Sequence, residues 1–306
     1  MVSEKARQHV EAVRALSKPG QALGFEAPTS TIYNPGWWID GEPTPSRDRL
    51  HRRLLEEVRL AAPDVKQESR ALILAGPPGA GKGAIKEMVL GDEMLHFLNI
   101  DADDFKRLLL DEAQADGSYE TWLVPDEVRQ LENAGEQFFP LELASLVHEE
   151  SSYLAKALRL DAIQAGDNII IDAVLAGEAT ALALGDLLAE ADYNVEVVDV
   201  EVPFELSEQR IQSRWMKSYE NALNGVGTEL GGRWVPSEYS RDVFSGPDGR
   251  SKPEAIARSL AEKCDAVIRY RVYRTGMDQA YKQNAIPVLE VHKERAQRGA
   301  SLVDVK

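Results

Sequence analysis

Residues 71–82 read ALILAGPPGAGK, an apolar run that passes directly into a glycine-rich turn ending in Lys82. The apolar run predicts a buried strand, and the turn predicts the start of a helix. The glycines and the lysine have the G-x-x-x-x-G-K spacing of a phosphate-binding loop, or P-loop, in which backbone N–H groups surround a polyphosphate. The residues expected to bind the phosphates are Gly76, Pro77, Pro78, Gly79, Ala80, Gly81, Lys82, Gly83 and Ala84.

The end of this loop differs from the usual pattern. In most P-loops the lysine is followed by a serine or threonine whose hydroxyl binds Mg²⁺, but here Gly83 and Ala84 follow Lys82. If this loop binds Mg²⁺, we expect it to do so through water and the nucleotide, with Asp103 or Asp172 behind them. The alternative reading, an ordinary glycine-rich turn between a strand and a helix, leaves the spacing and the lysine unexplained.

The composition limits the class of protein. Of the 306 residues, 43% are hydrophobic and 28% are charged, as in soluble globular proteins. Acidic residues outnumber basic ones by 51 to 35, which argues against a general nucleic-acid surface. No apolar stretch is long enough to span a bilayer, the first residues lack a signal-peptide core, and the single Cys264 excludes a disulfide within the chain. We expect a cytoplasmic protein with neither nucleic acid nor a membrane as a partner.

Strands and helices alternate along the chain after residue 70. Such alternation predicts an α/β fold with a mostly parallel sheet flanked by helices, as in P-loop kinases. Residues 1–69 are expected to form a helical and irregular N-terminal extension packed on this core, and residues 70–306 the kinase-like domain. An acidic, loop-rich segment is expected between residues 111 and 140. The expected strands after the P-loop are residues 96–100, 168–174, 195–202, 266–273 and 287–291.

Acidic residues follow the carboxyl ends of two of these strands, where parallel sheets bind ligands. Asp101 and Asp103 come after residues 96–100, and Asp172 lies near the end of the strand 168–174. We expect them to converge with the P-loop on one cleft. An aspartate there can orient an acceptor hydroxyl and take its proton; Asp103 is the candidate, with helix capping as the alternative. Asp172 either helps to hold Mg²⁺ through water or caps the next turn.

Three arginines are candidates for binding phosphate. Arg210 and Arg214 lie one turn apart on the expected helix 204–223, and Arg233 follows a glycine-rich stretch. Arginine can hold phosphate oxygens with two parallel hydrogen bonds. Spacing alone does not distinguish this role from a solvated or paired arginine.

These motifs together resemble the zeta toxin family of bacterial small-molecule kinases. The resemblance covers about residues 71–244 and rests on GPPGAGK (76–82), IDADDFK (100–106), NIIIDA (168–173), the arginine-bearing helix and GRWVP (232–236). It implies a P-loop kinase fold that uses ATP or GTP with Mg²⁺. It also implies phosphorylation of the 3′-hydroxyl of UDP-N-acetylglucosamine, and an antitoxin partner that blocks the nucleotide site.

The resemblance also implies roles for individual residues. Lys82, Asp103 and Arg233 match catalytic positions, and Arg214 matches a further one for which Arg210 is the alternative. An acidic family position in the helix before the third strand falls near Glu149 and Glu150. The residues implied to be catalytic are Lys82, Asp103, Arg214 and Arg233, and those implied to contact the acceptor substrate are Asp101, Asp103, Glu150, Asp172 and Arg233.

Two departures from the family pattern concern the substrate. The P-loop hydroxyl is missing, and Ala173-Val174 replaces the family's Gly-Thr, whose threonine contacts the sugar nucleotide. The leading hypothesis is an ATP- and Mg²⁺-dependent kinase of a hydroxyl-bearing metabolite, such as a nucleotide sugar, that acts as a toxin. The alternatives are a housekeeping or antibiotic-modifying kinase on the same scaffold, and a nucleotide-binding module with little catalysis.

Overall fold

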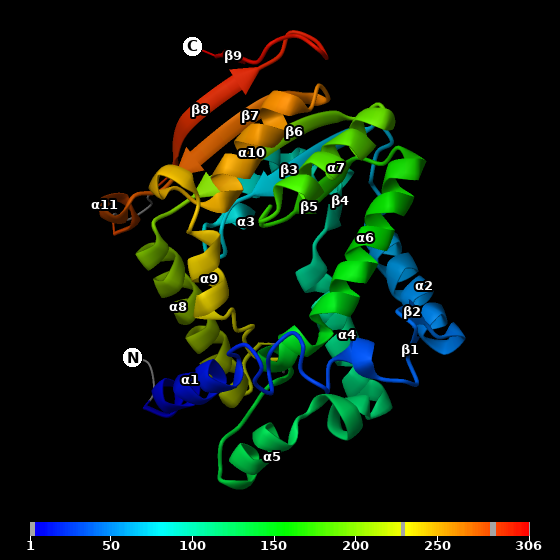
Figure 1. Cartoon of the computed structure of the whole chain (residues 1–306), viewed down its shortest axis with the longest axis vertical. Helices are drawn as coiled ribbons and strands as arrows, with labels where there is room; N and C mark the ends of the chain where they lie inside the picture. The colour runs from blue at the N-terminus through cyan, green and yellow to red at the C-terminus, as the bar shows by residue number, and fades with distance from the viewer. Residues whose placement is uncertain (1–3, 228–229, 282–285, 306) are drawn as a thin grey trace. The chain divides into compact units, whose positions relative to one another are not determined.

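The protein consists of two compact units. A computed structural model describes residues 4–227, 230–281 and 286–305 (Figure 1). No helix in these ranges is long and apolar enough to cross a membrane. The division into residues 1–69 and 70–306 expected from the sequence stays a prediction. The helical unit comprises Met1–Val58, Ala102–Ala157 and Ile211–Pro236, and the sheet unit comprises Arg59–Asp101, Leu158–Arg210 and Ser237–Lys306.

The sheet unit is built on strands that run in the order β4-β5-β3-β6-β7-β8-β9 among the described residues (Figure 1). Neighbours from β4 to β7 are parallel, and β8 and β9 are antiparallel. The α/β fold with a mostly parallel sheet is therefore confirmed. The strand before the P-loop lies between two parallel neighbours, so its residues 71–75 are buried. The bounds are β3 (Arg70–Ala75), β4 (Leu98–Ile100), β5 (Ile169–Asp172), β6 (Asn194–Glu201), β7 (Val267–Arg274), β8 (Val288–Glu294) and β9 (Val303–Asp304).

Alternate residues of β6 face opposite sides of the sheet. Val198 and Val200 belong to an apolar cluster with Ile85 of α3. Helices α7 and α10 pack closely on each other at Gly185. A Cβ at this position would lie 2.7 Å from Leu260 Cδ1. Cys264 is buried there, as expected for a small packed residue. The other bounds in this unit are α3 (Lys82–Leu90), η2 (Gly91–His96), α7 (Glu178–Glu190), α9 (Ser237–Val243), η5 (Pro247–Gly249), α10 (Lys252–Lys263) and α11 (Met277–Ala280).

The helical unit contains the segment that was expected to be a loop, residues 111–140. That expectation is wrong, because α4 continues to Asp116 and two further helical segments follow it. Leu110 and Ala113 continue the buried face of α4, and Val128 is the buried residue of α5. Acidic residues occupy exposed positions of these helices. The bounds are α1 (Glu4–Leu16), η1 (Thr31–Tyr33), β1 (Trp38–Ile39), β2 (Glu42–Pro43), α4 (Ala102–Asp116), η3 (Tyr119–Leu123), α5 (Asp126–Asn133) and η4 (Pro140–Val147), and three helices have residues in both units, α2 (Pro45–Leu60), α6 (His148–Ala165) and α8 (Phe204–Leu223).

A fully buried histidine fastens α1 to the helical unit. His9 Nδ1 lies 2.8 Å from Glu136 Oε2, and His9 Nε2 lies 3.1 Å from Glu142 Oε1. The imidazole also stacks on the ring of Tyr219 at a centroid distance of 4.5 Å. Burial lowers the pKa of His9, but the hydrogen bonds and charges of Glu142 and Glu136 outweigh it and raise the pKa above the ordinary value. The N-terminal helix is therefore held by a buried polar contact as well as by apolar packing.

The sheet unit contains a buried acid cluster, which we define as Asp199, Glu201 and Glu254. Asp199 and Glu201 lie on the face of β6 that is turned to α10, and both are at most 1% exposed. Ser251 Oγ donates to Glu201 Oε1 at 2.7 Å, and Arg274 Nη2 donates to Glu254 Oε1 at 2.8 Å. Neither carboxylate oxygen of Asp199 has a hydrogen-bond partner among the described residues.

Two of these acids, Asp199 and Glu201, have pKa values that the fold raises. Burial, and then the charge of Glu201, raise the pKa of Asp199 well above its ordinary value. Burial raises the pKa of Glu201 to about 7, with Glu254 adding to the effect and Ser251 opposing it. Because an ionised carboxylate is costly in an apolar interior, the fold disfavours the charged form of Asp199.

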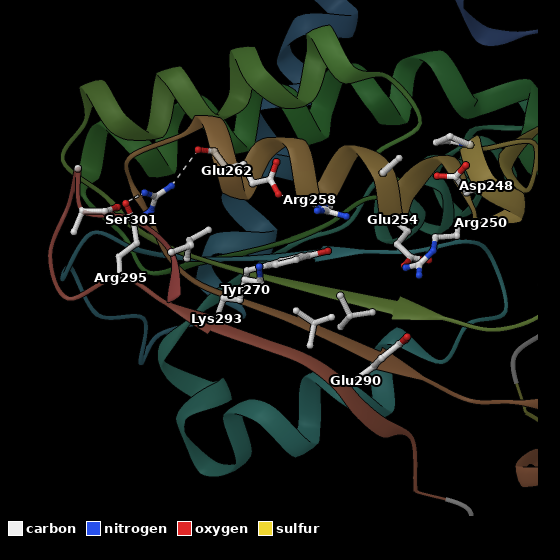
Figure 2. Close-up of a pocket in the computed structure, with 17 residues that line it drawn as sticks. Asp248, Arg250, Glu254, Arg258, Glu262, Tyr270, Glu290, Lys293, Arg295 and Ser301 are labelled. Carbon is white, nitrogen blue, oxygen red and sulfur yellow. Dashed lines mark hydrogen bonds and ion pairs between the residues drawn. The ribbon is translucent and has the colours of Figure 1, made fainter. Parts of the chain in front are cut away.

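A pocket of about 940 Å³ lies beside this cluster, between α10 and the strands β7 and β8 (Figure 2). Glu254 and Arg258 line it from the helix, and Tyr270 lines it from the sheet. On β8, Glu290 and Lys293 contribute charges of both signs. One member of the buried acid cluster, Glu254, thus lines the pocket.

We expect Asp199→Asn to stabilise the protein at alkaline pH. When folding raises the pKa of an acid, the folded state binds more protons than the unfolded state. The free energy of unfolding therefore falls as pH rises above about 4, by about 1.4 kcal/mol per pH unit for each proton. Asparagine has a similar shape and no charge, so this loss should shrink. Thermal unfolding at pH 5 and pH 8.5 should show a gain in Tm for the variant mainly at pH 8.5; an equal effect at both values would contradict a raised pKa of Asp199.

Candidate active site

The P-loop joins β3 to α3 in the sheet unit and depends on two glycines. Gly76 has a φ of 127°, and a Cβ at this position would lie 2.2 Å from the backbone oxygen of Val200 in β6. Gly81, just before α3, has a φ of 100°. Because other residues rarely adopt such angles and no side chain fits against β6, the path of the loop requires glycine at both positions.

Lys82, the first residue of α3, lies against the loop and a neighbouring strand. Its Nζ donates to the backbone oxygen of Gly76 at 3.0 Å and lies 3.5 Å from Asp172 Oδ1. Asp172 ends β5, which pairs with β3, so its carboxylate is beside the lysine of the P-loop. The described residues contain no group of three or more His, Cys, Asp or Glu that could hold a metal ion. One carboxylate at a phosphate site nevertheless suits Mg²⁺, which keeps several waters and takes its other ligands from the nucleotide.

Helix α8 holds the P-loop from its other side through two residues of the sheet unit. Ser207 Oγ donates to the backbone oxygen of Pro78 at 2.6 Å. Arg210 Nη1 donates to the backbone oxygens of Gly79 and Ala80 at 3.2 and 3.0 Å. These contacts fix the carbonyl groups of the loop. Ser207 belongs to none of the sequence motifs, although its spacing of three from Arg210 places both residues on one face of the helix.

In the helical unit Asp103 is held between two cations at the start of α4. Its Oδ2 lies 2.9 Å from Arg233 Nη2, and its Oδ1 accepts a hydrogen bond from Lys106 Nζ at 3.1 Å. Burial raises the pKa of Asp103, but the charges of Arg233 and Lys106 outweigh burial and hold the pKa below the ordinary value. Asp103 is therefore ionised at neutral pH.

Arg214 and Arg233 are brought to this carboxylate by neighbouring parts of the helical unit. Burial, and then the charge of Arg233, lower the pKa of Arg214, while Asp103 opposes them. Arg233 follows Gly232, at which a Cβ would lie 2.8 Å from the backbone oxygen of Trp215 in α8. The glycine thus lets the segment that carries Arg233 lie directly on the helix that carries Arg214.

Glu150 is placed differently from the other expected substrate contacts. It is fully buried in α6, where its Oε1 accepts from Arg47 Nε at 2.5 Å and its Oε2 from Arg47 Nη2 at 2.8 Å. His51 Nε2 lies 2.6 Å from the same Oε1. Burial raises the pKa of Glu150, but His51 and Arg47 outweigh it and lower the pKa to about 2. Glu150 therefore joins α2 to α6, and the exposed acid of this turn is Glu149.

The expected convergence on one cleft involves residues of both units, so it stays a prediction. The sheet unit holds the P-loop and Asp172, and Asp101 is the last residue of one of its segments, between β4 and α4. The helical unit brings together Asp103, Arg214 and Arg233.

The fold and the loop are those of a P-loop kinase-like protein. The family model described as Zeta toxin matches residues 56–284, which is more than half of the chain. The protein belongs to the zeta toxin family.

Two solved structures of the AvrRxo1-ORF1:-ORF2 complex agree with this fold. The crystal structure of AvrRxo1-ORF1:-ORF2 with ATP is 17% identical over 86% of this chain and 71% of that chain, with a TM-score of 0.57. The structure of AvrRxo1-ORF1:AvrRxo1-ORF2 with sulphate ions is 18% identical over 89% and 72%, with a TM-score of 0.56. A structure from the PezAT chromosomal toxin-antitoxin system of Streptococcus pneumoniae is 15% identical over 81% of each chain, with a TM-score of 0.49. No curated protein sequence matches the chain.

We expect Ser207→Ala to weaken ATP binding about fivefold. The substitution removes the hydrogen bond that holds the carbonyl of Pro78, and such a bond contributes about 1 kcal/mol. Calorimetric titration with ATP and Mg²⁺ measures the effect. Ser213→Ala, at an exposed position of the same helix, is the matched control and should bind like the wild type. Equal affinities for both variants would contradict a supporting role for Ser207.

Proposed function

We propose that the protein is an ATP- and Mg²⁺-dependent kinase that phosphorylates a hydroxyl group of a small metabolite. The observation that carries the proposal is the ionised Asp103, held by Arg233 and Lys106 in a chain with a P-loop of the zeta toxin family. A carboxylate of this kind orients a hydroxyl and accepts its proton, whereas a nucleotide-binding module has no need of it.

The donor side of the reaction rests on the sheet unit. The N–H groups of the P-loop and the ammonium of Lys82 would bind the β- and γ-phosphates of ATP, or of GTP. When the nucleotide binds, the Lys82 ammonium would give up its hydrogen bond to the backbone oxygen of Gly76 and donate to a phosphate oxygen instead. When bound, Mg²⁺ would neutralise phosphate charge, and Asp172 is the residue that would hold it, through water.

The acceptor side rests on the helical unit. The hydroxyl oxygen forms a bond to the γ-phosphorus, the bond from that phosphorus to the bridging oxygen breaks, and ADP leaves. Asp103 takes the hydroxyl proton. Arg214 and Arg233 stabilise the negative charge on the transferred group. A lowered pKa makes Asp103 a weak base, which suits a loose transition state in which the proton moves late.

The substrate we propose is a nucleotide sugar such as UDP-N-acetylglucosamine, and the biological role that of a toxin in the cytoplasm with an antitoxin as partner. A relative crystallised as an ORF1:ORF2 complex with ATP supports a nucleotide and a protein partner. In the helix before β5, Glu149 replaces Glu150 as the proposed acidic contact, because Glu150 is paired inside the fold. Asp101 and Asp172 remain proposed acceptor contacts.

A second candidate is a kinase of the same chemistry that acts on another metabolite. Val174 stands where the family has a threonine that contacts the sugar nucleotide, and a valine cannot make that hydrogen bond. Expression in a sensitive host separates the two candidates, since a toxin should arrest growth and a housekeeping enzyme should not.

We expect Asp103→Asn to lower phosphoryl transfer at least 100-fold, because general base catalysis contributes about 10²–10⁴. The measurement is a mass-spectrometric search of a metabolite extract for compounds that gain one phosphate in the presence of ATP. ATP binding should remain, since the P-loop lies in the other unit. Asp104→Asn, at the adjacent exposed position, is the control and should keep its activity. Full activity of Asp103→Asn would refute the proposed base.

A further inference from the structure

We infer that His148, supported by the ring of Phe25, contacts the acceptor substrate and positions its hydroxyl group. This inference rests on the proposed kinase function. It adds two residues that neither the P-loop motif nor the IDADDFK and GRWVP segments contain. One of them comes from the part of the chain before the P-loop, which thereby becomes a part of the acceptor site.

His148 stands next to the Asp103 cluster in the helical unit. It is the first residue of α6 and directly follows η4. The segment η4 packs against α4, whose first two turns carry Asp103 and Lys106. The side chain is 36% exposed, so a bound molecule can reach it. His148 thus combines access from solvent with a place beside the proposed base.

Burial, together with the neighbouring cations, keeps the ring of His148 neutral. Burial, and then the charge of Lys106, lower the pKa of His148 to about 4; Arg233 acts in the same direction, and Asp103 opposes them. A neutral imidazole has one nitrogen that donates and one that accepts a hydrogen bond. It can therefore bind a hydroxyl group of the acceptor without adding a further positive charge to a cluster that already has three cations.

One nitrogen of this ring lacks a hydrogen-bond partner among the described residues. His148 Nδ1 is buried and has no hydrogen bond to any of the described residues, and Nε2 is 3.9 Å from Glu149 Oε1, beyond hydrogen-bond distance. Leaving a buried polar atom unpaired costs about 1–3 kcal/mol, so native proteins rarely do it without reason. The buried Nδ1 is closed to a bound molecule, so the imidazole would contact the substrate through Nε2.

The N-terminal segment supplies the second wall. The rings of Phe25 and His148 are 4.8 Å apart and tilted by 45°. Phe25 is 37% exposed although its side chain is large and apolar. Its position is fixed by hydrogen bonds on both sides, from Ser145 Oγ to the backbone oxygen of Leu23 at 2.7 Å and from Ser30 Oγ to that of Leu146 at 2.8 Å.

These contacts assign separate tasks within the acceptor site. Lys106, Arg214 and Arg233 provide positive charge, and Asp103 takes the proton. Phe25 and His148 offer a ring surface on which a planar or sugar ring of the acceptor can pack, and the imidazole offers the hydrogen bond that fixes the hydroxyl relative to Asp103. His148 is thus a substrate-binding residue, and Phe25 is a positioning residue that acts partly through it.

The test compares variants in the phosphorylation of a metabolite extract and, separately, of UDP-N-acetylglucosamine, each at several acceptor concentrations. We expect His148→Leu to raise the KM for the acceptor about fivefold to tenfold, as for one lost hydrogen bond. His148→Gln, which keeps a donor and an acceptor, should recover part of the loss. Phe25→Ala should raise the same KM, and Phe25→Leu should raise it less. The KM for ATP should stay within twofold in all four variants.

His292→Gln, on β8 of the sheet unit, is the matched control and should behave as the wild type. Histidine side-chain NMR gives a readout that does not depend on activity. The His148 signal is assigned by its loss in His148→Gln. It should shift when the unphosphorylated acceptor, as identified with the wild type, is added, and it should not shift with ATP alone.

The outcomes separate this inference from the function on which it rests. If the wild type phosphorylates an acceptor and His148→Leu does so with the same KM, the inference is overturned and the kinase function stands. If the KM for ATP rises as much as that for the acceptor, His148 has a general structural role, which also overturns the inference. If the wild type phosphorylates nothing in the extract, the proposed function is overturned and the inference with it.

Discussion

The arrangement of the sheet unit depends on the close approach between Gly76 and the backbone of Val200. This approach lets the P-loop turn directly over the end of β6, where any Cβ would collide with a carbonyl oxygen. The loop is then fixed from two further directions, by Lys82 on Gly76 and by Ser207 and Arg210 of α8 on the next carbonyls. The glycines and the lysine therefore do not fix the loop alone: an adjacent strand limits its path, and a helix holds its carbonyl groups.

Charge is distributed unevenly in this acidic chain. The net charge is −16, yet Asp103 lies among cations, and Arg233 and Lys106 depress its pKa. By contrast, Glu150 is neutralised by Arg47 and His51 inside the fold. Similar acid–base pairs thus serve different ends: the pair that is partly open to solvent suits chemistry, whereas the fully buried one ties two helices together. Exposure of the carboxylate distinguishes the two.

The sequence was sufficient to predict features that depend on neighbouring residues. The P-loop, the α/β fold and the parallel core strands follow from local spacing and apolar runs, and they agree with the structure. Features that depend on distant residues were missed. Glu150 was expected at the substrate because Arg47 and His51, about a hundred positions earlier, give no sign of pairing with it. Residues 111–140 were expected to be a loop because their many acids hid the buried face of Leu110 and Ala113. Nothing in the local sequence joined Phe25 to His148.

The buried acid cluster also changes how folding is linked to protons. Acid-sensitive proteins commonly release protons on folding, because their carboxylates become paired. In the sheet unit Asp199 and Glu201 bind protons more tightly when folded, and in the helical unit the raised pKa of His9 acts in the same direction. Because their pKa values are higher in the folded state, these groups take up protons as the chain folds, and at these groups mass action by protons favours the folded state. For these three groups the proton acts as a ligand of the native protein, whereas His148, whose pKa is lowered to about 4, acts in the opposite direction.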